Sequence, residues 1–238
     1  MAPSRRRSGS APSLAVVLIV AVLILGFYVL RGDLGDLTGN LPADNKTEGG
    51  GGKASPATRD APKGDPGGDN TAAIRRLGGR VDYGRVDPRT GQRSGITATI
   101  VPAMVEAAAD DRIGTPAEQD IRPPGWNDLP TRNRSRGHLL GRQLGGTGDL
   151  EQNLVAMYQR RANSPVMRDY ETAIADAVEK GETVRYRVKP GYASPTDKGA
   201  PVVVRLTATG NRGLRFDVSI ANTANAEVTE YIPLKGAA

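Results

Sequence analysis

The segment Asn133–Gly146, NRSRGHLLGRQLGG, contains His138, the only histidine of the 238-residue chain. Gly137 allows close approach of the backbone, Arg136 could hold an anion, and a Gly-Gly turn closes the segment. A neutral imidazole with a pKa near 6.5 is a suitable general base at neutral pH. A lone histidine is more often structural, however, so the surrounding sequence has to supply its chemical partners.

The composition restricts the chemistry that such a site can use. The chain has no cysteine, which excludes disulfides and thiolate-bound metals, and one histidine cannot complete a zinc site. A hard cation such as Mg²⁺ needs only one or two protein oxygens and keeps several waters. Asn153, Asn163 and Glu171 offer such oxygens. In the simpler alternative, Asn163 is a turn residue and Glu171 is a solvated helix charge, and neither has a functional role.

The hydrophobic pattern predicts an α+β fold with an antiparallel sheet and one prominent helix. Residues 95–105 alternate in part, and residues 138–144 are short and compatible with a strand. Three later segments alternate between apolar and polar residues and are separated by Gly, Pro or Asn turns: 183–192, 201–208 and 214–221.

The prominent helix is predicted between Ser164 and Gly181. Ser164 and Pro165 are typical of an N-cap and a first helical position, and Gly181 is typical of a C-cap. Glu171 would lie about two turns into this helix. Apolar residues recur at helical spacing at Val166, Met167, Tyr170, Ile174, Ala177 and Val178.

The N-terminal part predicts a membrane anchor. Residues 1–13 form a basic tail with three adjacent arginines, and residues 14–30 are an apolar run of about 26 Å as a helix. We expect an uncleaved transmembrane anchor rather than a cleaved signal peptide, because no small-residue cleavage site follows. The arginines would keep the N-terminus cytoplasmic and send the rest of the chain outside, where cleavage would release it as a secreted protein.

A linker and a globular domain are predicted after the anchor. Residues 31–71 are rich in Gly, Pro, Asp and Lys and lack apolar periodicity, which is typical of a disordered linker. Its root-mean-square reach would be roughly 35 Å. Residues 72–238 remain for one domain, whose core must be mainly aliphatic because only 4% of residues are aromatic.

The segment from Arg136 to Glu171 resembles the core of the DNA/RNA non-specific endonucleases, which are His-Me finger, or ββα-metal, nucleases. The family pattern is Asp-Arg-Gly-His, a Gly-rich loop ending in Asp, Asn-Leu-Val/Ile, a second Asn and a helical Glu. The resemblance extends to the secreted, membrane-associated and toxin-borne nucleases of Gram-positive bacteria. The matching elements are Arg136-Gly137-His138, Gly145-Gly146-Thr147-Gly148-Asp149, Asn153-Leu154-Val155, Asn163 and Glu171.

The resemblance implies a role for each matched residue. His138 would be the general base that activates water, and Arg136 would contact the scissile phosphate. Asn163 would bind a single Mg²⁺ or Mn²⁺ ion, and Glu171 would hold metal-bound waters. Asn153 is expected to keep the loop in shape and is the alternative metal ligand.

The sequence departs from the family pattern in two places. Ser135 stands where the family has Asp, so the orientation of Arg136 or His138 is expected to depend on another group. The connection between Asn153 and Asn163 is one residue longer than usual.

Basic residues surround the matched segment. Between Pro130 and Tyr170 there are seven arginines and three acidic residues, a balance of +4. This balance suits a polyanion, although a solvated basic surface would give the same count. Arg134, Arg142 and Arg160 are the expected contacts with DNA or RNA, made to the backbone because few aromatic residues are available to stack on bases.

Together these features predict a metal-dependent, non-specific endonuclease that acts on DNA, RNA or both outside the cytoplasmic membrane. Two alternatives stay open: a catalytically weak nucleic-acid-binding or uptake module, and a nuclease toxin. No toxin-delivery domain is recognisable, which favours the membrane-anchored endonuclease over the toxin. A protein inhibitor would be a further partner, which the sequence does not identify.

Overall fold

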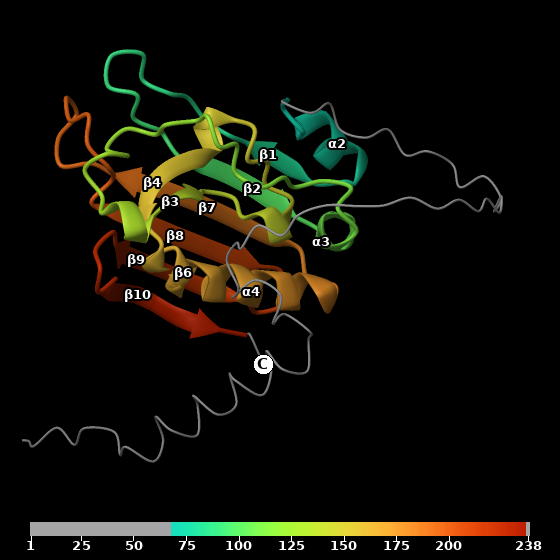
Figure 1. Ribbon diagram of the computed structural model, residues 1–238. Coiled ribbons are helices and arrows are strands. Elements are labelled where there is room, and N and C mark those ends of the chain that lie inside the picture. The colour runs from blue at the N-terminus through green and yellow to red at the C-terminus, as the bar shows by residue number, and fades with distance from the viewer. Residues whose placement is uncertain (1–67, 237–238) are drawn as a thin grey trace, which may run out of the picture. The chain divides into compact units, whose positions relative to one another are not determined.

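Residues 68–236 are described by the computed structural model, in which six strands form one antiparallel sheet (Figure 1). The strand order is β1-β2-β7-β8-β9-β10. A separate two-stranded ladder, β3–β4, and the helix α4 lie on one side of this sheet (Figure 1). The strands are β1 (Arg80–Asp82), β2 (Ile96–Ile100), β3 (Arg134–His138), β4 (Leu154–Tyr158), β5 (Arg160–Arg161), β6 (Ser164–Pro165), β7 (Val184–Gly191), β8 (Val203–Gly210), β9 (Arg215–Ala221) and β10 (Val228–Lys235).

Residues 68–236 also contain six short or medium helices. The α-helices are α2 (Thr71–Arg76), α3 (Pro102–Ala109) and α4 (Val166–Glu179), and the 3-10 helices are η2 (Thr131–Asn133), η3 (Arg142–Leu144) and η4 (Glu151–Asn153). The α+β class with a mainly antiparallel sheet is therefore confirmed.

The three C-terminal strands predicted from alternation are confirmed as β7, β8 and β9, with small changes at their ends. In β7 the alternate residues Val184, Tyr186 and Val188 are completely buried, because successive side chains of a strand point to opposite faces. The core is mainly aliphatic, as expected, with Phe216 as its one buried phenylalanine among residues 68–236. The alternation thus determined which face of the sheet is covered.

The predicted helix is confirmed as α4, and its predicted end is also confirmed. Gly181 has a φ of +87°, a left-handed conformation that favours glycine. Its N–H and that of Glu182 donate to the carbonyls of Val178 and Ala177, which closes the last turn.

The predicted start of α4 is wrong. Ser164 and Pro165 pair with the residues of β5 as strand β6, and α4 begins at Val166 without a side-chain cap. The N–H of Met167 donates instead to the carbonyl of Ala162, at 3.1 Å. The turn before β6 brings that carbonyl under the helix, so backbone oxygens replace the hydroxyl that we expected.

Two predicted strands have different bounds in the structure. The segment 95–105 is a strand only to Ile100, because Pro102 begins α3. The segment 138–144 contributes only His138, the last residue of β3, and then turns into η3. Gly145, with a φ of +89°, ends η3 and is the turn that the sequence indicated.

The folded part begins before Ala72, where the sequence analysis placed the domain boundary. The side chain of Asn70 donates to the carbonyl of Gly145, at 2.7 Å, and accepts the hydroxyl of Tyr83, at 2.7 Å. The predicted basic tail, the anchor at 14–30 and the linker up to residue 67 lie outside the described residues. Within the part that is described, no helix is long and apolar enough to cross a membrane.

Candidate active site

The candidate site is built on the β3–β4 ladder and the start of α4. Register pairs Arg136 with Ala156, Gly137 with Val155 and His138 with Leu154. The chain then returns through β5 and β6 and enters α4. This order of two antiparallel strands and a helix is the ββα arrangement that the family resemblance implies.

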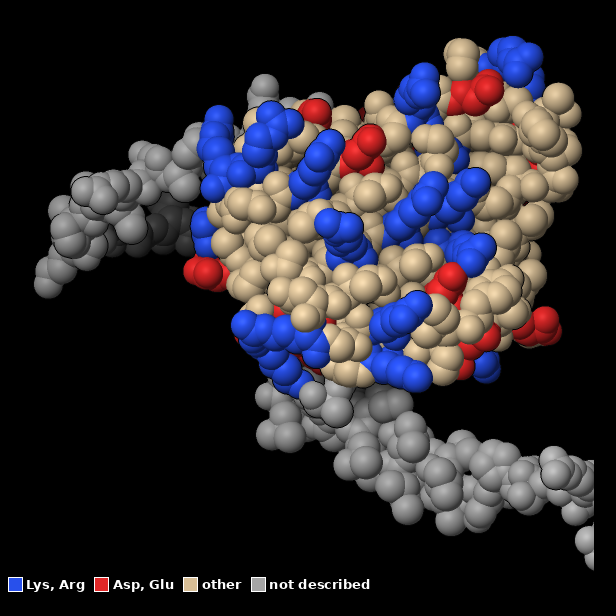
Figure 2. All heavy atoms as spheres, turned by 180° about the vertical axis from the view of Figure 1, so that it is seen from behind, with Lys and Arg blue, Asp and Glu red and all other residues tan. Residues whose placement is uncertain are grey.

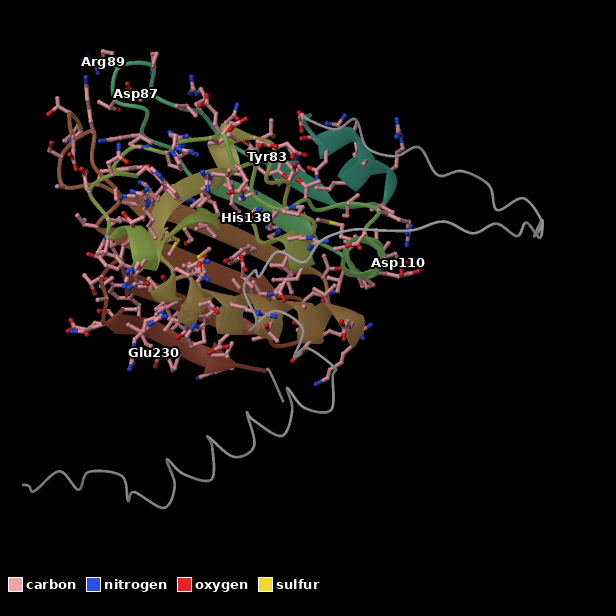
Figure 3. All side chains as sticks on the ribbon, viewed as in Figure 1. Tyr83, Asp87, Arg89, Asp110, His138 and Glu230 are labelled. Carbon is pink, nitrogen blue, oxygen red and sulfur yellow. The ribbon has the colours of Figure 1, made fainter. Side chains whose placement is uncertain are left out.

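His138 is held by a backbone carbonyl rather than by a carboxylate. Its Nε2 lies 3.1 Å from the carbonyl oxygen of Thr115, which can only accept, so Nε2 carries the proton. Burial lowers the pKa of His138, and the positive charge of Arg142 lowers it further. The ring is therefore neutral at pH 7, with Nδ1 left as the acceptor. In the view of Figure 3, His138 lies near the middle of the domain, whereas Arg89 and Asp110 lie at its edge.

Thr115 is held in turn by the Gly-rich loop after His138. Its hydroxyl donates to Asp149, at 2.9 Å, and lies 3.0 Å from the hydroxyl of Thr147. A side chain at Gly148 would collide with the carbonyl of Pro116, so the two segments can approach only with glycine there. The loop thus orients the histidine through Thr115. The sequence contained no signal for Thr115, because a backbone carbonyl has no residue signature.

Asn163 lies beside the strand that carries the histidine. A Cβ atom at Gly137 would be 3.2 Å from Asn163 Oδ1 and would also strike the side chain of Met157. Asn163 Nδ2 donates to Gln159 Oε1, at 3.0 Å, which orients the amide. No hydrogen bond within residues 68–236 uses Asn163 Oδ1, so this oxygen has free acceptor capacity.

Glu171 lies beside Gly141, four residues along the chain from Gly137. Its Oε1 accepts the N–H of Gly141 at 2.9 Å, and only 7% of the residue is exposed. Burial raises the pKa of Glu171 to about 8, opposed by the Gly141 hydrogen bond and by Arg168. A Cβ atom at Gly141 would collide with the carboxyl group, so glycine is required there. The protonated carboxyl is therefore favoured near neutral pH more than in a free glutamate, whereas a bound cation would favour the ionised form.

Asn153 has a different environment from Asn163. It is completely buried, its Oδ1 accepts the N–H of Leu140, and its Nδ2 donates to the carbonyls of Leu140 and Thr147. These bonds tie the segment after His138 to the Gly-rich loop. The arrangement corresponds to the loop-holding role expected of Asn153.

Arg134 and Arg136 lie on the same face of β3 and turn toward one loop. Their guanidinium carbons lie 4.6 and 4.3 Å from the ring centroid of Trp126. Arg136 Nε donates to the carbonyl of Ile121 at 2.7 Å, and its Nη atoms donate to the carbonyl and side chain of Gln119. This loop therefore orients Arg136.

Ser135 does not take over the orienting role of the family Asp. Its hydroxyl donates across the ladder to the carbonyl of Met157, at 3.4 Å, and makes no contact with Arg136 that the structure records. The groups that orient Arg136 are therefore Gln119 and Ile121, which accept its hydrogen bonds. Neither residue was singled out from the sequence.

The remaining predicted substrate contacts are more dispersed. Arg142 pairs with Asp111, at 2.7 Å, and Arg160 is exposed. The structure thus places Asn163 and Glu171 beside residues 137–141, with Arg142 next in the chain and close enough for its charge to act on His138. A hollow of about 390 Å³ between α2, β1 and η4 is lined by none of the predicted site residues.

Comparison with known proteins assigns this domain. The model of the family described as DNA/RNA non-specific endonuclease matches residues 94–209. Residues 94–209 are therefore a DNA/RNA non-specific endonuclease domain. The match runs from the residues before β2 into β8 and includes every predicted site residue. Nuclease activity implies a nucleic acid substrate.

Solved nuclease structures have the same fold. NucA from Streptococcus agalactiae, with magnesium bound, has a TM-score of 0.51 and 23% identity; the similarity covers 64% of this chain and 80% of NucA. Sda1 nuclease, with bound zinc, has a TM-score of 0.50 and 19% identity over 60% of this chain and 75% of Sda1. No curated protein matches the chain.

Proposed function

We propose that this nuclease hydrolyses internal phosphodiester bonds of DNA, RNA or both, with His138 as general base and one Mg²⁺ or Mn²⁺ ion bound by Asn163. The observation that supports this proposal most directly is the hydrogen bond from His138 Nε2 to Thr115. It leaves Nδ1 of a neutral ring free to accept a proton at the pH where the lowered pKa keeps it unprotonated.

The residues around His138 define a hydrolytic step. Nδ1 accepts a proton from a water molecule, the water oxygen forms a bond to phosphorus, and the bond to the leaving sugar oxygen breaks. A second water supplies the proton for that oxygen. The Thr115 carbonyl keeps the ring in the required tautomer and stabilises the charged imidazolium that forms.

The donor groups present fit a hard divalent cation. Within residues 68–236 no three His, Cys, Asp or Glu side chains form a metal cluster, so a soft-metal site has no ligand set. An amide oxygen on Asn163, supported by the carboxyl of Glu171 through water, suits a cation that keeps most of its waters. When bound, the cation would supply positive charge to the phosphate and the leaving oxygen.

Two smaller observations support these assignments. Gly137 and Gly141 leave open the spaces beside Asn163 Oδ1 and the Glu171 carboxyl. Asn153 is less suited than Asn163, because its amide groups are buried and hydrogen-bonded to the backbone.

Arg136 is proposed to contact the scissile phosphate. Each of its three nitrogen atoms donates one hydrogen bond to the loop. Because a guanidinium has five N–H groups, two N–H groups stay available for the phosphate. The stacked Trp126 and the loop bonds hold the fork in place before substrate arrives. Arg134, Arg142 and Arg160 are proposed to make weaker backbone contacts.

The proposed location is outside the cytoplasmic membrane, with the chain anchored through residues 14–30. The support is the sequence pattern of the basic tail and the apolar run. The expected result is fractionation with membranes and digestion of the C-terminal domain by external protease. Full-length protein in the soluble cytosol would contradict the location without affecting the proposed chemistry.

Incubation of the full chain with supercoiled plasmid and with RNA tests the activity. We expect nicking and then degradation in Mg²⁺ or Mn²⁺, and none in EDTA. Equal cleavage in EDTA would contradict the metal-dependent mechanism. Binding without cleavage in any divalent cation would favour the catalytically weak module.

A further inference from the structure

The face of the six-stranded sheet turned away from α4 is solvent-exposed and strongly basic. Figure 2, which views the molecule from behind Figure 1, shows Lys and Arg distributed across this side. Alternation separates the two faces: on β9, the Phe216 ring lies 5.0 Å from the Tyr170 ring of α4, so its neighbours Arg215 and Asp217 point the other way. We call this exposed side the outer face.

The strand register aligns the charged residues of the outer face into rows. One row crosses all six strands and contains four cations and two threonines: Arg80, Thr99, Arg185, Thr209, Arg215 and Lys235. A second row contains Asp82, Thr97, Arg187, Thr207, Asp217 and Ile232. A third contains Lys189, Arg205, Ser219 and Thr229. Seven cations and two carboxylates give these rows a balance of +5.

Among the described residues, one of these seven cations has an acidic partner. Arg205 forms a bidentate pair with Asp217, with distances of 2.8 and 2.7 Å, and its guanidinium lies 4.8 Å from the ring of Tyr231. Within residues 68–236, no ion pair is formed by the other six, which are Arg80, Arg185, Arg187, Lys189, Arg215 and Lys235. Like charges held together at this density are unfavourable unless a polyanion binds them.

We propose that the outer face is a second nucleic-acid-binding surface, separate from the catalytic side and directed at the phosphate backbone. Six strands span about 24 Å, and duplex DNA carries about 14 negative charges over that length. Five of the seven cations are arginines, whose planar fork matches phosphate oxygens. The threonine hydroxyls between them can donate to the same backbone.

An anionic membrane surface is the competing occupant, and the composition of the rows disfavours it. Membrane-binding surfaces combine cations with apolar side chains that enter the headgroup region. Here the uncharged residues of the rows are threonines and a serine, apart from Ile232, and the strongly exposed Tyr231 is already stacked on Arg205. The proposal extends the proposed function, because a long nucleic acid substrate would contact both sides of the sheet.

The test compares two variants of the full chain that each lose three exposed arginines. R185Q/R187Q/R215Q removes cations from the outer face, and R76Q/R89Q/R112Q is the matched control from α2 and two loops. Binding is measured by fluorescence anisotropy in EDTA, with a duplex of about 40 base pairs, longer than the sheet is wide. Turnover is measured on bis(p-nitrophenyl) phosphate, which is too small to reach the outer face from the site.

We expect the outer-face variant to bind duplex about tenfold more weakly at low salt and to lower the salt slope by about 2.7, since each lost phosphate contact contributes about 0.9. Its turnover of the small substrate should equal that of wild type. Equal losses in the two variants would overturn the proposal. So would unchanged duplex binding with lost sedimentation on phosphatidylglycerol vesicles, which would assign the face to membranes.

This design separates the new surface from the proposed catalysis. If wild type cleaves neither plasmid nor the small substrate, the proposed function fails. The anisotropy comparison still decides whether the outer face binds DNA, because it is made without divalent cations.

Discussion

The two sides of the large sheet place polar groups in opposite ways. On the α4 side, His138, Asn163 and Glu171 are single groups, each oriented by a specific hydrogen bond, and Glu171 is buried. On the outer face, cations and threonines repeat in register and stay exposed. Bond-breaking chemistry needs a few groups at fixed positions, whereas holding a polyanion needs many interchangeable charges. Single substitutions should therefore have large effects on the α4 side and small ones on the outer face.

Replacement of His138 by alanine should give the largest effect. Loss of a general base typically reduces turnover about 10²–10⁴-fold, while duplex affinity in EDTA should stay within about twofold of wild type. Initial rates on plasmid and anisotropy on the same preparations measure both. Imidazole in solution should partly rescue His138→Gly. A folded His138→Ala protein that cleaves at the wild-type rate would falsify the assignment of the base.

Replacement of Asn163 by alanine tests whether a single amide oxygen binds the cation. The expected result is a loss of activity of more than about 100-fold at low Mg²⁺, since even indirect partners of a metal contribute 10–100-fold. Stability should hardly change, because the side chain is only partly buried. Isothermal titration with Mg²⁺ supplies a readout independent of turnover. Unaltered Mg²⁺ binding would remove Asn163 from the ligand set.

Asn153→Ala is the matched comparison for Asn163→Ala, because both residues lie on the same side of the sheet. It leaves the N–H of Leu140 and two carbonyls without partners in a buried position, so the free energy of unfolding should fall by about 2–4 kcal/mol. Urea unfolding in EDTA measures this without reference to activity. A stable but inactive Asn153→Ala protein, together with an active Asn163→Ala protein, would reverse the two roles.

The pH dependence of stability should show the buried carboxyl of Glu171. Its folded pKa of about 8 exceeds its ordinary value of 4.5, so between these values the folded state binds more protons than the unfolded state. Stability in EDTA therefore declines as pH rises through this interval. Relative to Glu171→Gln, wild type should lose at least about 2 kcal/mol from pH 5 to pH 8. Parallel curves for the two proteins would show that Glu171 titrates normally.

The smallest effect is expected from a pair of tyrosines. The hydroxyl of Tyr83 donates to Asn70 and accepts the N–H of Thr147, so Tyr83→Phe should destabilise by about 1–2 kcal/mol. The hydroxyl of Tyr186 is buried without a partner among residues 68–236, so Tyr186→Phe should be neutral or stabilising by up to about 1 kcal/mol. Thermal melts of both variants measure these two changes in stability. Equal losses would mean that Tyr186 has a polar partner, such as water.

Local pattern in the sequence was sufficient for the elements that depend on near neighbours. The period-two segments became β7 to β9, and Gly181 ended α4, because alternation and a left-handed turn are properties of a few consecutive residues. The matched motif also directed attention to Asn163 and Glu171, which lie beside Gly137 and Gly141, the residues that flank the segment carrying His138. Their chemical roles stay predictions until the variants are measured.

Other features were decided only by tertiary structure, because they depend on groups without a residue signature or on partners far away in the chain. The carbonyl of Thr115 orients His138, and carbonyls of residues 119 and 121 orient Arg136 in place of the expected acidic group. Backbone pairing, not Ser164, determined where α4 begins. The basic rows of the outer face exist because register aligns strands up to about 150 residues apart, as from Arg80 to Lys235. A sequence specifies each strand's alternation locally, but only the assembled sheet decides which charges become neighbours.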